Sequence, residues 1–315
     1  MILGFDIGGT KCAVTAAKSS REEIEIKASE KIPTDLTVTP DEMIDRLIAL
    51  ADRISGGERI EAVGISCGGP LDSEKGIIMS PPNLPGWDDV RIVKKLEDYY
   101  NVPVKLQNDA NACAVAEWKF GAGKGCKNMV FLTFGTGLGA GLIIDGKLYA
   151  GTNGNAGEVG HIRLDKSGPV GYEKSGSFEG FCSGGGIAQS GYALALKKAE
   201  SGEYPLYFKP GMKKEDVTAK SIADAAEQGD ETALEVYKIC GEHLGRGLAV
   251  LIDLLNPERI VIGSIFTRAK DLMWKYASEE IRREALKGNA DCCKVVCAQL
   301  GENLGNYAAI ATAML

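Results

Sequence analysis

Short apolar runs separated by polar turns begin the chain. Residues 2–5 are apolar, residues 6–11 form a polar turn that contains a glycine pair, and residues 13–16 are apolar again. Residues 23–27 alternate between polar and apolar positions with a period of two, which is typical of a half-buried strand. This pattern predicts a meander of strands with residues 23–27 at the edge of the sheet.

Helical periodicity follows from about Pro40 and stops at Gly56 and Gly57. The expected apolar face consists of Ile44, Leu47, Ile48, Ala51 and Ile54. Thr37 or Thr39 could cap this helix. Short apolar strands then alternate with further helices, so the first part of the chain is expected to be a mixed sheet with helices, an α/β domain.

The second half repeats this layout without an evident repeat of sequence. Strands are expected at residues 129–134 and 142–144, and Asp145-Gly146 is a strong signal for a two-residue hairpin. A long helix is expected over about residues 230–255. Each half begins with a strand, a Gly/Thr turn and a second strand, which predicts two duplicated α/β lobes.

The composition is that of an ordinary globular protein. With 315 residues the chain suits two lobes, a small N-terminal lobe of residues 1–113 and 303–315 and a large C-terminal lobe of residues 114–302. The formal net charge of −7 argues against nucleic acid as a partner, because phosphate backbones are held by clustered Lys and Arg. The chain starts without a basic segment and has no long apolar run, so we expect no secretory signal, no membrane span and a cytoplasmic protein.

Nine cysteines are scattered along the chain. Without an export signal they are expected to be reduced and mostly buried. Cys292, Cys293 and Cys297 lie close together, but no histidine is near them in the sequence and the residues between alternate like a strand. Packing is therefore favoured over metal binding for these three.

Residues suited to phosphate binding gather in the first glycine turn. Gly8 and Gly9 allow backbone N–H groups to point into open space, Thr10 adds a hydroxyl and Lys11 adds a cation. Asp6 would repel a phosphate unless a divalent cation lay between them, so Asp6 is expected to hold Mg²⁺ indirectly. The alternative is a Gly-Gly hairpin with a charged tip.

A second glycine turn lies between Thr133 and Gly141. Residues 135–140 match G-x-G-x-x-G/A, but a dinucleotide site of that type requires a following helix. Residues 142–147 have the pattern of a strand and hairpin, so we reject a Rossmann site. Two such turns facing each other, one in each lobe, could grip the phosphates of a nucleotide, an arrangement that resembles the ribonuclease H-like ATPase fold of actin and hexokinase.

Asp109 stands where a strand is expected to end and a helix to begin. It could simply be the N-cap of that helix. The helix is rich in small residues, which would let a substrate come close, and phosphoryl transfer requires a carboxylate beside the acceptor hydroxyl. We expect the helix dipole and backbone donors to keep Asp109 ionised.

Hydrogen-bond acceptors suited to a polyol lie further along the chain. Glu158 and His161 belong to a glycine-containing loop, and Glu179 follows it. Each sugar hydroxyl donates one hydrogen bond, and a pocket that leaves one unmade loses much affinity. Asn83, from the first lobe, would add an amide.

With its motifs in this order, the chain closely resembles the ROK family of bacterial sugar kinases (repressors, open reading frames, kinases). Residues 6–11 and 133–139 resemble the phosphate motifs of the family, residues 83–87 its acceptor loop and residues 304–310 its closing helix. The resemblance implies that the sugar is held by Gly69, Asn83, Asn108, Asp109, Glu158, His161 and Glu179, with Asp109 as the catalytic base. It implies that ATP is held by Asp6, Gly8, Gly9, Thr10, Lys11, Thr133, Gly135, Thr136, Gly137 and Gly263, the last of which falls where the family holds the adenosine.

The chain departs from the family at the zinc motif. Many members hold a structural Zn²⁺ through C-x-C-G-x-x-G-C-x-E. When this pattern ends on Glu179, its cysteine positions are occupied by Val170, Tyr172 and Ser177. None of these offers a thiolate, so we expect no zinc, and Tyr172 and Phe178 are expected to fill the volume by packing.

These features predict an ATP- and Mg²⁺-dependent kinase that phosphorylates a hexose, with glucose at its 6-hydroxyl as the expected acceptor and Asp109 as the base. N-acetylhexosamine, mannose, fructose and β-glucosides stay open as the sugar, and polyphosphate stays open as the donor. A non-catalytic sugar-sensing protein is the alternative of another class. ROK repressors carry a helix-turn-helix domain before their sugar-binding lobes, and the first phosphate strand here begins at Ile2, which argues against that class. The family often dimerises, so a homodimer is also open.

Overall fold

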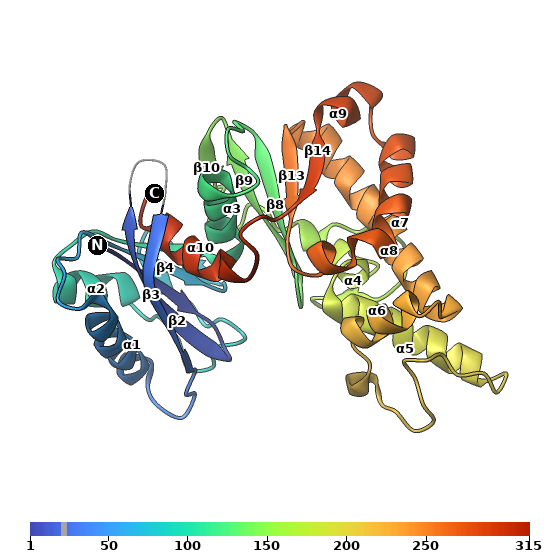
Figure 1. The fold of residues 1–315 in the computed structure, drawn as a ribbon, viewed down its shortest axis with the longest axis horizontal. Helices are drawn as coiled ribbons and strands as arrows, with labels where there is room; N and C mark the ends of the chain where they lie inside the picture. The colour runs from blue at the N-terminus through green and yellow to red at the C-terminus, as the bar shows by residue number, and fades with distance from the viewer. Residues whose placement is uncertain (20–23) are drawn as a thin grey trace. The chain divides into compact units, whose positions relative to one another are not determined.

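The computed structural model describes residues 1–19 and 24–315. The first sheet has the strand order β3-β2-β1-β4-β7 (Figure 1). Its strands are β1 (Ile2–Ile7), β2 (Lys11–Ser19), β3 (Ile24–Pro33), β4 (Ala62–Cys67) and β7 (Val104–Asn108). β1, β2 and β3 form an antiparallel meander, while β4 is parallel to both β1 and β7. The predicted meander and its edge strand are confirmed, except that Glu23 lies outside the described residues.

Helices flank this first sheet. They are α1 (Pro40–Ser55), α2 (Ile92–Tyr100), α3 (Asp109–Phe120) and α10 (Leu304–Thr312), with the short strands β5 (Leu71–Asp72) and β6 (Ile77–Ile78) and the turn η3 (Gly301–Asn303). Thr39 caps α1 through a capping box with Glu42, and Gly56 ends the helix with a left-handed φ of 60°. The predicted apolar face of α1 is buried, with Ile54 partly so.

The two faces of the first sheet have separate cores. Leu3 and Phe5 of β1 belong to the larger core with α1 and α2, whereas Ile2 packs with Ile310 of α10. α10 lies directly on the backbone of the sheet, because a Cβ atom on Gly64 would stand 2.0 Å from the Ala309 carbonyl oxygen. The first turn of α10 lies near the end of β1, because a Cβ atom on Gly305 would stand 2.8 Å from Asp6 Oδ2.

The second sheet has the matching order β10-β9-β8-β13-β14. Its strands are β8 (Met129–Phe134), β9 (Leu138–Ile144), β10 (Lys147–Tyr149), β13 (Arg259–Ile262) and β14 (Lys294–Cys297). Asp145 and Gly146 connect β9 to β10 with φ angles of 50° and 71°, the left-handed pair that a tight two-residue hairpin requires. The predicted duplication is therefore confirmed as a shared strand order.

The remaining helices belong to the second half of the chain. They are α4 (Phe178–Phe181), α5 (Gly184–Ala199), α6 (Ala219–Glu227), α7 (Glu231–Leu255), α8 (Ile265–Glu284) and α9 (Lys287–Cys292), with the turns η1 (Val159–His161) and η2 (Lys214–Asp216) and the hairpin of β11 (Val170–Gly171) and β12 (Lys174–Ser175). Asp230 caps α7, the predicted long helix. No helix in residues 1–19 or 24–315 is long and apolar enough to cross a membrane.

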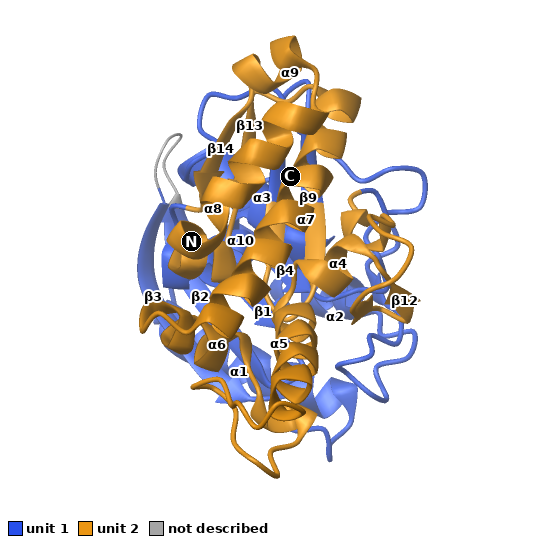
Figure 2. Ribbon diagram, turned by 90° about the vertical axis from the view of Figure 1, so that its right-hand side faces the viewer, with its two compact units in different colours: residues 1–131, 141–156, 299–315 blue, residues 132–140, 157–298 orange. Residues whose placement is uncertain are grey.

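The chain forms two compact units, coloured separately in Figure 2. Unit 1 consists of residues 1–131, 141–156 and 299–315, and unit 2 consists of residues 132–140 and 157–298. All of α3 belongs to unit 1. The lobe boundaries expected from the sequence stay a prediction, since a compact unit need not coincide with a lobe.

Candidate functional site

In unit 1 the predicted site residues follow the carboxyl ends of parallel strands. Ile7, Cys67 and Asn108 are in register across β1, β4 and β7, so the segments that leave these strands start side by side. In open α/β sheets this edge is where ligands bind. The three segments carry the first glycine turn, Gly69 and Asp109.

The first glycine turn packs closely against the predicted acceptor loop. A Cβ atom on Gly9 would stand 2.2 Å from the Asn83 carbonyl oxygen, so this turn tolerates only glycine there. Thr10 and Lys11 are exposed. The turn is braced by Thr34, whose hydroxyl donates to the Gly8 carbonyl oxygen at 2.6 Å. Thr34 was missed in the sequence, because nothing local marks a residue that supports a distant turn.

Asp109 is the first residue of α3, and the cap is Asn108. The side-chain oxygen of Asn108 accepts from the Ala110 N–H at 3.0 Å, and Asp109 Oδ1 accepts from the same N–H at 2.8 Å. The suggestion that Asp109 is merely an N-cap is therefore wrong. Gly69 lies close by, since its Cβ atom would stand 3.4 Å from Asn108 Nδ2.

The Asp109 carboxyl group is less acidic than the helix N-terminus alone would make it. The Asp109 side chain is exposed at the surface, but much of the protein lies around it. Desolvation by these surroundings raises the pKa of its carboxyl group. The backbone N–H groups of Ala110 and Asp109 lower that pKa but do not outweigh desolvation. The helix N-terminus alone does not keep this carboxyl group strongly acidic, and a raised pKa suits a group that must accept a proton.

Asp6 lies at the end of β1 and is mostly buried. Desolvation, together with the charge of Asp109, raises its pKa from 3.8 to about 6, and Lys31 and Lys11 partly offset that rise. Within the described part of the chain, neither carboxylate oxygen has a hydrogen-bond donor. Asp6 thus lacks hydrogen-bond donors in that part of the chain and lies near a second carboxylate, that of Asp109. This arrangement suits Mg²⁺, which binds carboxylate oxygens and water.

In unit 2 the second glycine turn is held by its own hydrogen bonds. Thr133 Oγ1 accepts from the Gly139 N–H at 3.0 Å. The first N–H groups of α5 bind the turn from outside, Gly184 donating to the Gly135 carbonyl at 2.8 Å. β9 begins directly afterwards, at Leu138, so the rejection of a Rossmann site is confirmed.

Gly263 and Ser264 lie beside this turn. The Gly263 N–H donates to the Leu132 carbonyl at 3.0 Å, and a Cβ atom on Gly135 would stand 3.7 Å from Ser264 Oγ. Ser264 has a φ of 56°, a strained backbone for a residue with a side chain. Strain of this kind cannot be read from the sequence.

The predicted sugar ligands of unit 2 fall into two groups. Glu158 directly precedes η1 and His161 is the last residue of that turn, and both are exposed. Glu179 is partly buried in α4, and its Oε2 accepts from the Leu138 N–H at 3.0 Å. This contact joins Glu179 to the second glycine turn and was not predicted, because the two residues lie far apart in the sequence.

The segment that replaces the zinc motif is the β11–β12 hairpin. Phe178 is fully buried, as predicted, but Tyr172 is 70% exposed, so its predicted packing role is wrong. Tyr172 and Glu173 form the turn with φ angles of 41° and 64°, which points Tyr172 outward, and its ring meets the His161 ring edge-on at 5.3 Å. No group of three or more potential ligands for a metal ion occurs among residues 1–19 and 24–315, and the absence of zinc stays a prediction.

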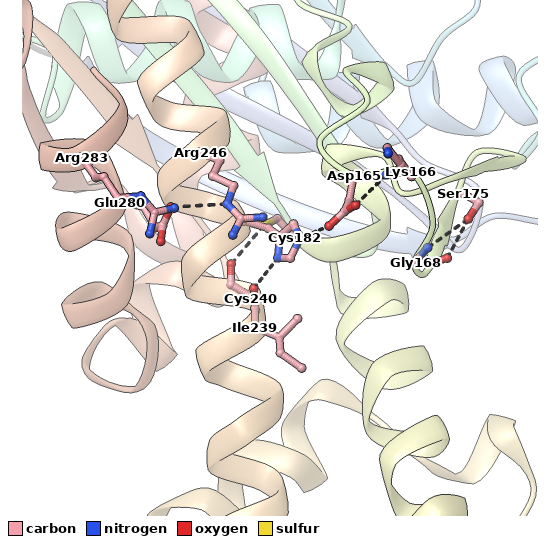
Figure 3. Close-up of polar contacts among 11 residues, drawn as sticks. Asp165, Lys166, Gly168, Ser175, Cys182, Ile239, Cys240, Arg246, Glu280 and Arg283 are labelled. Atoms are coloured by element: carbon pink, nitrogen blue, oxygen red, sulfur yellow. Dashed lines mark hydrogen bonds and ion pairs between the residues drawn. The ribbon is translucent and has the colours of Figure 1, made fainter. Parts of the chain in front are cut away.

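Polar contacts brace this hairpin. Lys174 donates to the His161 carbonyl oxygen at 2.5 Å. Ser175 Oγ donates to the Gly168 carbonyl oxygen at 2.9 Å, as Figure 3 shows. Ser177 is buried and caps α4 by accepting from the Gly180 N–H at 3.1 Å. These bonds tie the loop to the residues on both sides of it.

His243 of α7 lies behind α4 and was not singled out in the sequence. Its ring stacks on Phe181 with centroids 3.5 Å apart, and its Nδ1 donates to the Ile239 carbonyl oxygen at 2.8 Å. Its Nε2 stands 3.8 Å from Asp165, on the loop shown in Figure 3. Burial lowers the pKa of His243, so the ring is neutral at pH 7.

A match to the sequence model of the ROK family covers residues 2–314. The glucokinase of Streptomyces coelicolor is 33% identical over 307 residues, which cover 97% of this chain and 95% of that enzyme. NagC, a DNA-binding transcriptional dual regulator of Escherichia coli, is 31% identical over 262 residues, which cover 81% of this chain and 61% of the regulator.

Solved structures agree with this grouping. The crystal structure of a ROK family glucokinase from Streptomyces griseus in complex with glucose and AMPPNP matches with a TM-score of 0.76 at 31% identity. The match covers 99% of this chain and 98% of that enzyme. The mixed sheets therefore form the two-lobed α/β fold of ROK sugar kinases.

Proposed function

The chain belongs to the ROK family, and from this premise we propose that it transfers the γ-phosphoryl group of ATP to a hexose, with glucose as the preferred sugar and its 6-hydroxyl as the acceptor. The relatives named as glucokinases support the sugar and the reaction. The glucokinase that contains glucose and an ATP analogue supports the donor. The observation that carries the proposal is the Asp109 carboxylate, which is exposed while Asn108 caps the helix.

Asp109 would accept the proton of the sugar hydroxyl as that hydroxyl attacks the γ-phosphate. Desolvation favours this step, since the raised pKa of Asp109 makes its ionised form a stronger base. Asn108 uses its side-chain oxygen as the cap, which leaves its Nδ2 to donate to the sugar. Asn83 and Gly69 would complete the sugar contacts of unit 1.

Phosphate binding would use both glycine turns. Gly8, Gly9, Thr10 and Lys11 would bind phosphate oxygens in unit 1, and the turn that contains Thr136 would do so in unit 2. Asp6 would hold Mg²⁺, which neutralises charge on the transferring phosphoryl group when it is bound. Because Thr136 is exposed and the backbone of its turn is already hydrogen-bonded, this turn offers a preformed surface.

A sugar-sensing protein is the second candidate, favoured by the similarity to NagC. A sensor needs the sugar ligands but has no use for a basic carboxylate beside the acceptor hydroxyl. The intact Asp6 and Asp109 pair therefore favours the kinase.

A coupled assay of ADP release over a panel of sugars tests the proposal. The panel consists of glucose, 6-deoxyglucose, mannose, fructose, N-acetylglucosamine and a β-glucoside, with ATP and polyphosphate compared as donors by product formation. We expect glucose with ATP to give the highest kcat/KM and 6-deoxyglucose to give no product. Sugar binding without product from any sugar would favour the sensor instead.

A further inference from the structure

Glu179 touches the second glycine turn with one of its two carboxylate oxygens. Oε2 accepts from the Leu138 N–H at 3.0 Å. A Cβ atom on Gly137 would stand 2.8 Å from the same oxygen, with the Glu179 carboxyl carbon as its next neighbour at 3.5 Å. The turn therefore has a glycine where the carboxylate approaches.

The other sugar-binding segment of unit 2 packs on the same stretch of backbone. The Ala140 N–H donates to the Gly157 carbonyl at 2.9 Å, and a Cβ atom on Gly160 would stand 2.3 Å from the Leu138 carbonyl oxygen. The N-terminus of α5 holds the turn from another direction through Gly184. Backbone contacts thus fix this segment to the turn, while Glu179 adds a charged side chain.

Glu158 and Glu179 differ in this respect. Glu158 is exposed, and among the described residues its carboxylate makes no hydrogen bond or ion pair with the turn. Glu179 is partly buried, and its Oε1 is left to accept from a ligand. A charged acceptor makes a stronger hydrogen bond to an N–H group than a neutral one does.

We propose that Glu179 couples the two substrates, with Oε1 accepting from a sugar hydroxyl while Oε2 holds the phosphate turn in its binding conformation. This inference rests on the proposed function. A sugar bound at Oε1 would limit the motion of the Glu179 carboxylate. Because Oε2 accepts from the Leu138 N–H, the motion of the turn that ends at Leu138 would be limited as well. Sugar therefore increases the affinity for nucleotide, and by linkage nucleotide increases the affinity for sugar by the same factor.

Calorimetry with AMPPNP and Mg²⁺, in the absence and presence of glucose, tests the coupling. Without sugar, Glu179→Ala should weaken AMPPNP binding by about tenfold or more, the usual cost of a lost hydrogen bond to a charged group. The matched variant Glu158→Ala should weaken glucose binding. Its affinity for AMPPNP in the absence of sugar should equal that of the unaltered chain. In steady-state kinetics, Glu179→Ala should raise the KM of both substrates and Glu158→Ala that of the sugar alone.

Glu179→Gln separates this role from a merely structural one. Its amide oxygen can still accept from the Leu138 N–H, so AMPPNP affinity without sugar should recover to within about threefold of the original, whereas sugar affinity stays reduced. Gly137→Ala pushes the carboxylate away with the charge intact and should behave as Glu179→Ala does towards nucleotide.

The coupling is overturned if Glu179→Ala and Gly137→Ala bind AMPPNP as the unaltered chain does. It is also overturned if glucose leaves the AMPPNP affinity of the unaltered chain unchanged although glucose binds. Failure of the unaltered chain to bind or phosphorylate any sugar would instead contradict the proposed function.

Discussion

The turn between the first two strands of each sheet has the same place in the topology but a different charge. In unit 1, the β1–β2 turn follows Asp6, a carboxylate short of donors whose pKa burial and Asp109 raise to about 6. In unit 2, backbone groups of the β8–β9 turn form hydrogen bonds with the side chains of Thr133 and Glu179 and with the first N–H groups of α5. The same topology thus holds two carboxylates with raised pKa values, Asp6 and Asp109, at the first sheet, and a hydrogen-bonded turn at the second. Groups held in unfavourable charge states cluster at functional sites, which supports the proposal that the catalytic carboxylates are Asp6 and Asp109 of unit 1.

Asp6→Asn removes the charge that makes the first turn different. We expect kcat/KM to fall by about a hundredfold or more, because charge neutralisation by a metal ion is worth several kcal/mol. We expect stability to rise at the same time. A carboxyl group whose pKa is higher in the folded state than in the unfolded state contributes stability at low pH that is lost as the pH rises through about 6.

At pH 8 Asp6→Asn should raise the free energy of unfolding by an amount on the order of 2–3 kcal/mol, and at pH 4 this increase should nearly vanish. Thermal unfolding at these two pH values in Mg²⁺-free buffer measures it. If Asp6→Asn were less stable than the unaltered chain at pH 8, the ionised Asp6 carboxylate would not destabilise the fold.

Gly305→Ala displaces the same carboxylate without removing it. A Cβ atom on Gly305 would stand 2.8 Å from Asp6 Oδ2, and its other close neighbour is the Asp6 carboxyl carbon at 3.7 Å. Because α10 is helical at this position, alanine favours folding by up to about 1 kcal/mol. We therefore expect kcat to fall by about ten- to a hundredfold with stability unchanged or higher, because an ångström-scale misplacement at a reacting centre can cost up to about a hundredfold.

Gly288→Ala is the matched control, since nothing lies within 4 Å of a Cβ atom there. Steady-state kinetics over a range of Mg²⁺ concentrations separates the two variants. Equal kcat in both would mean that the position of Asp6 does not limit the reaction.

The pH dependence of kcat/KM reports the charge at the first turn directly. Burial and the charge of Asp109 raise the pKa of Asp6 to about 6, and desolvation also raises the pKa of Asp109. Activity should therefore fall at a pH clearly above the ordinary carboxylate value of about 4. The fall should approach about tenfold per pH unit for one essential carboxylate and be steeper for two. A profile that is flat down to pH 5 would contradict the raised pKa values.

Tyr172→Ala tests the hairpin that replaces the zinc motif and should have the smallest effect. The Tyr172 side chain is 70% exposed and makes an edge-on contact with His161, worth about 0.5 kcal/mol at such a site. We expect the sugar KM to rise by about twofold with the KM of ATP unchanged. A rise beyond tenfold would show that Tyr172 contacts the sugar itself.

The sequence was sufficient where local pattern decides structure. Periodicity predicted α1 and α7, and the strand expected after the second turn excluded a dinucleotide site. The place of Asp109 at a strand-to-helix junction was likewise predicted.

Contacts between distant residues could not be predicted in this way. The bond between Glu179 and Leu138 and the stacking of His243 on Phe181 join segments that no short motif links. The pKa of Asp109 depends on how much protein surrounds it, whereas the sequence shows only the helix that begins there. Tyr172 was misplaced because a large aromatic residue in an apparent gap was expected to fill it, while its left-handed turn directs it outward.

The role of Asp109 is tested most directly by comparing turnover with sugar binding in Asp109→Asn. Asparagine keeps the shape and an oxygen that can accept from the Ala110 N–H but cannot take up a proton. We predict that kcat falls by about a hundred- to ten-thousandfold, the usual contribution of a general base, while calorimetry finds the dissociation constant for glucose within about threefold of the original. Turnover within tenfold of the unaltered chain would contradict the assignment of Asp109 as the base.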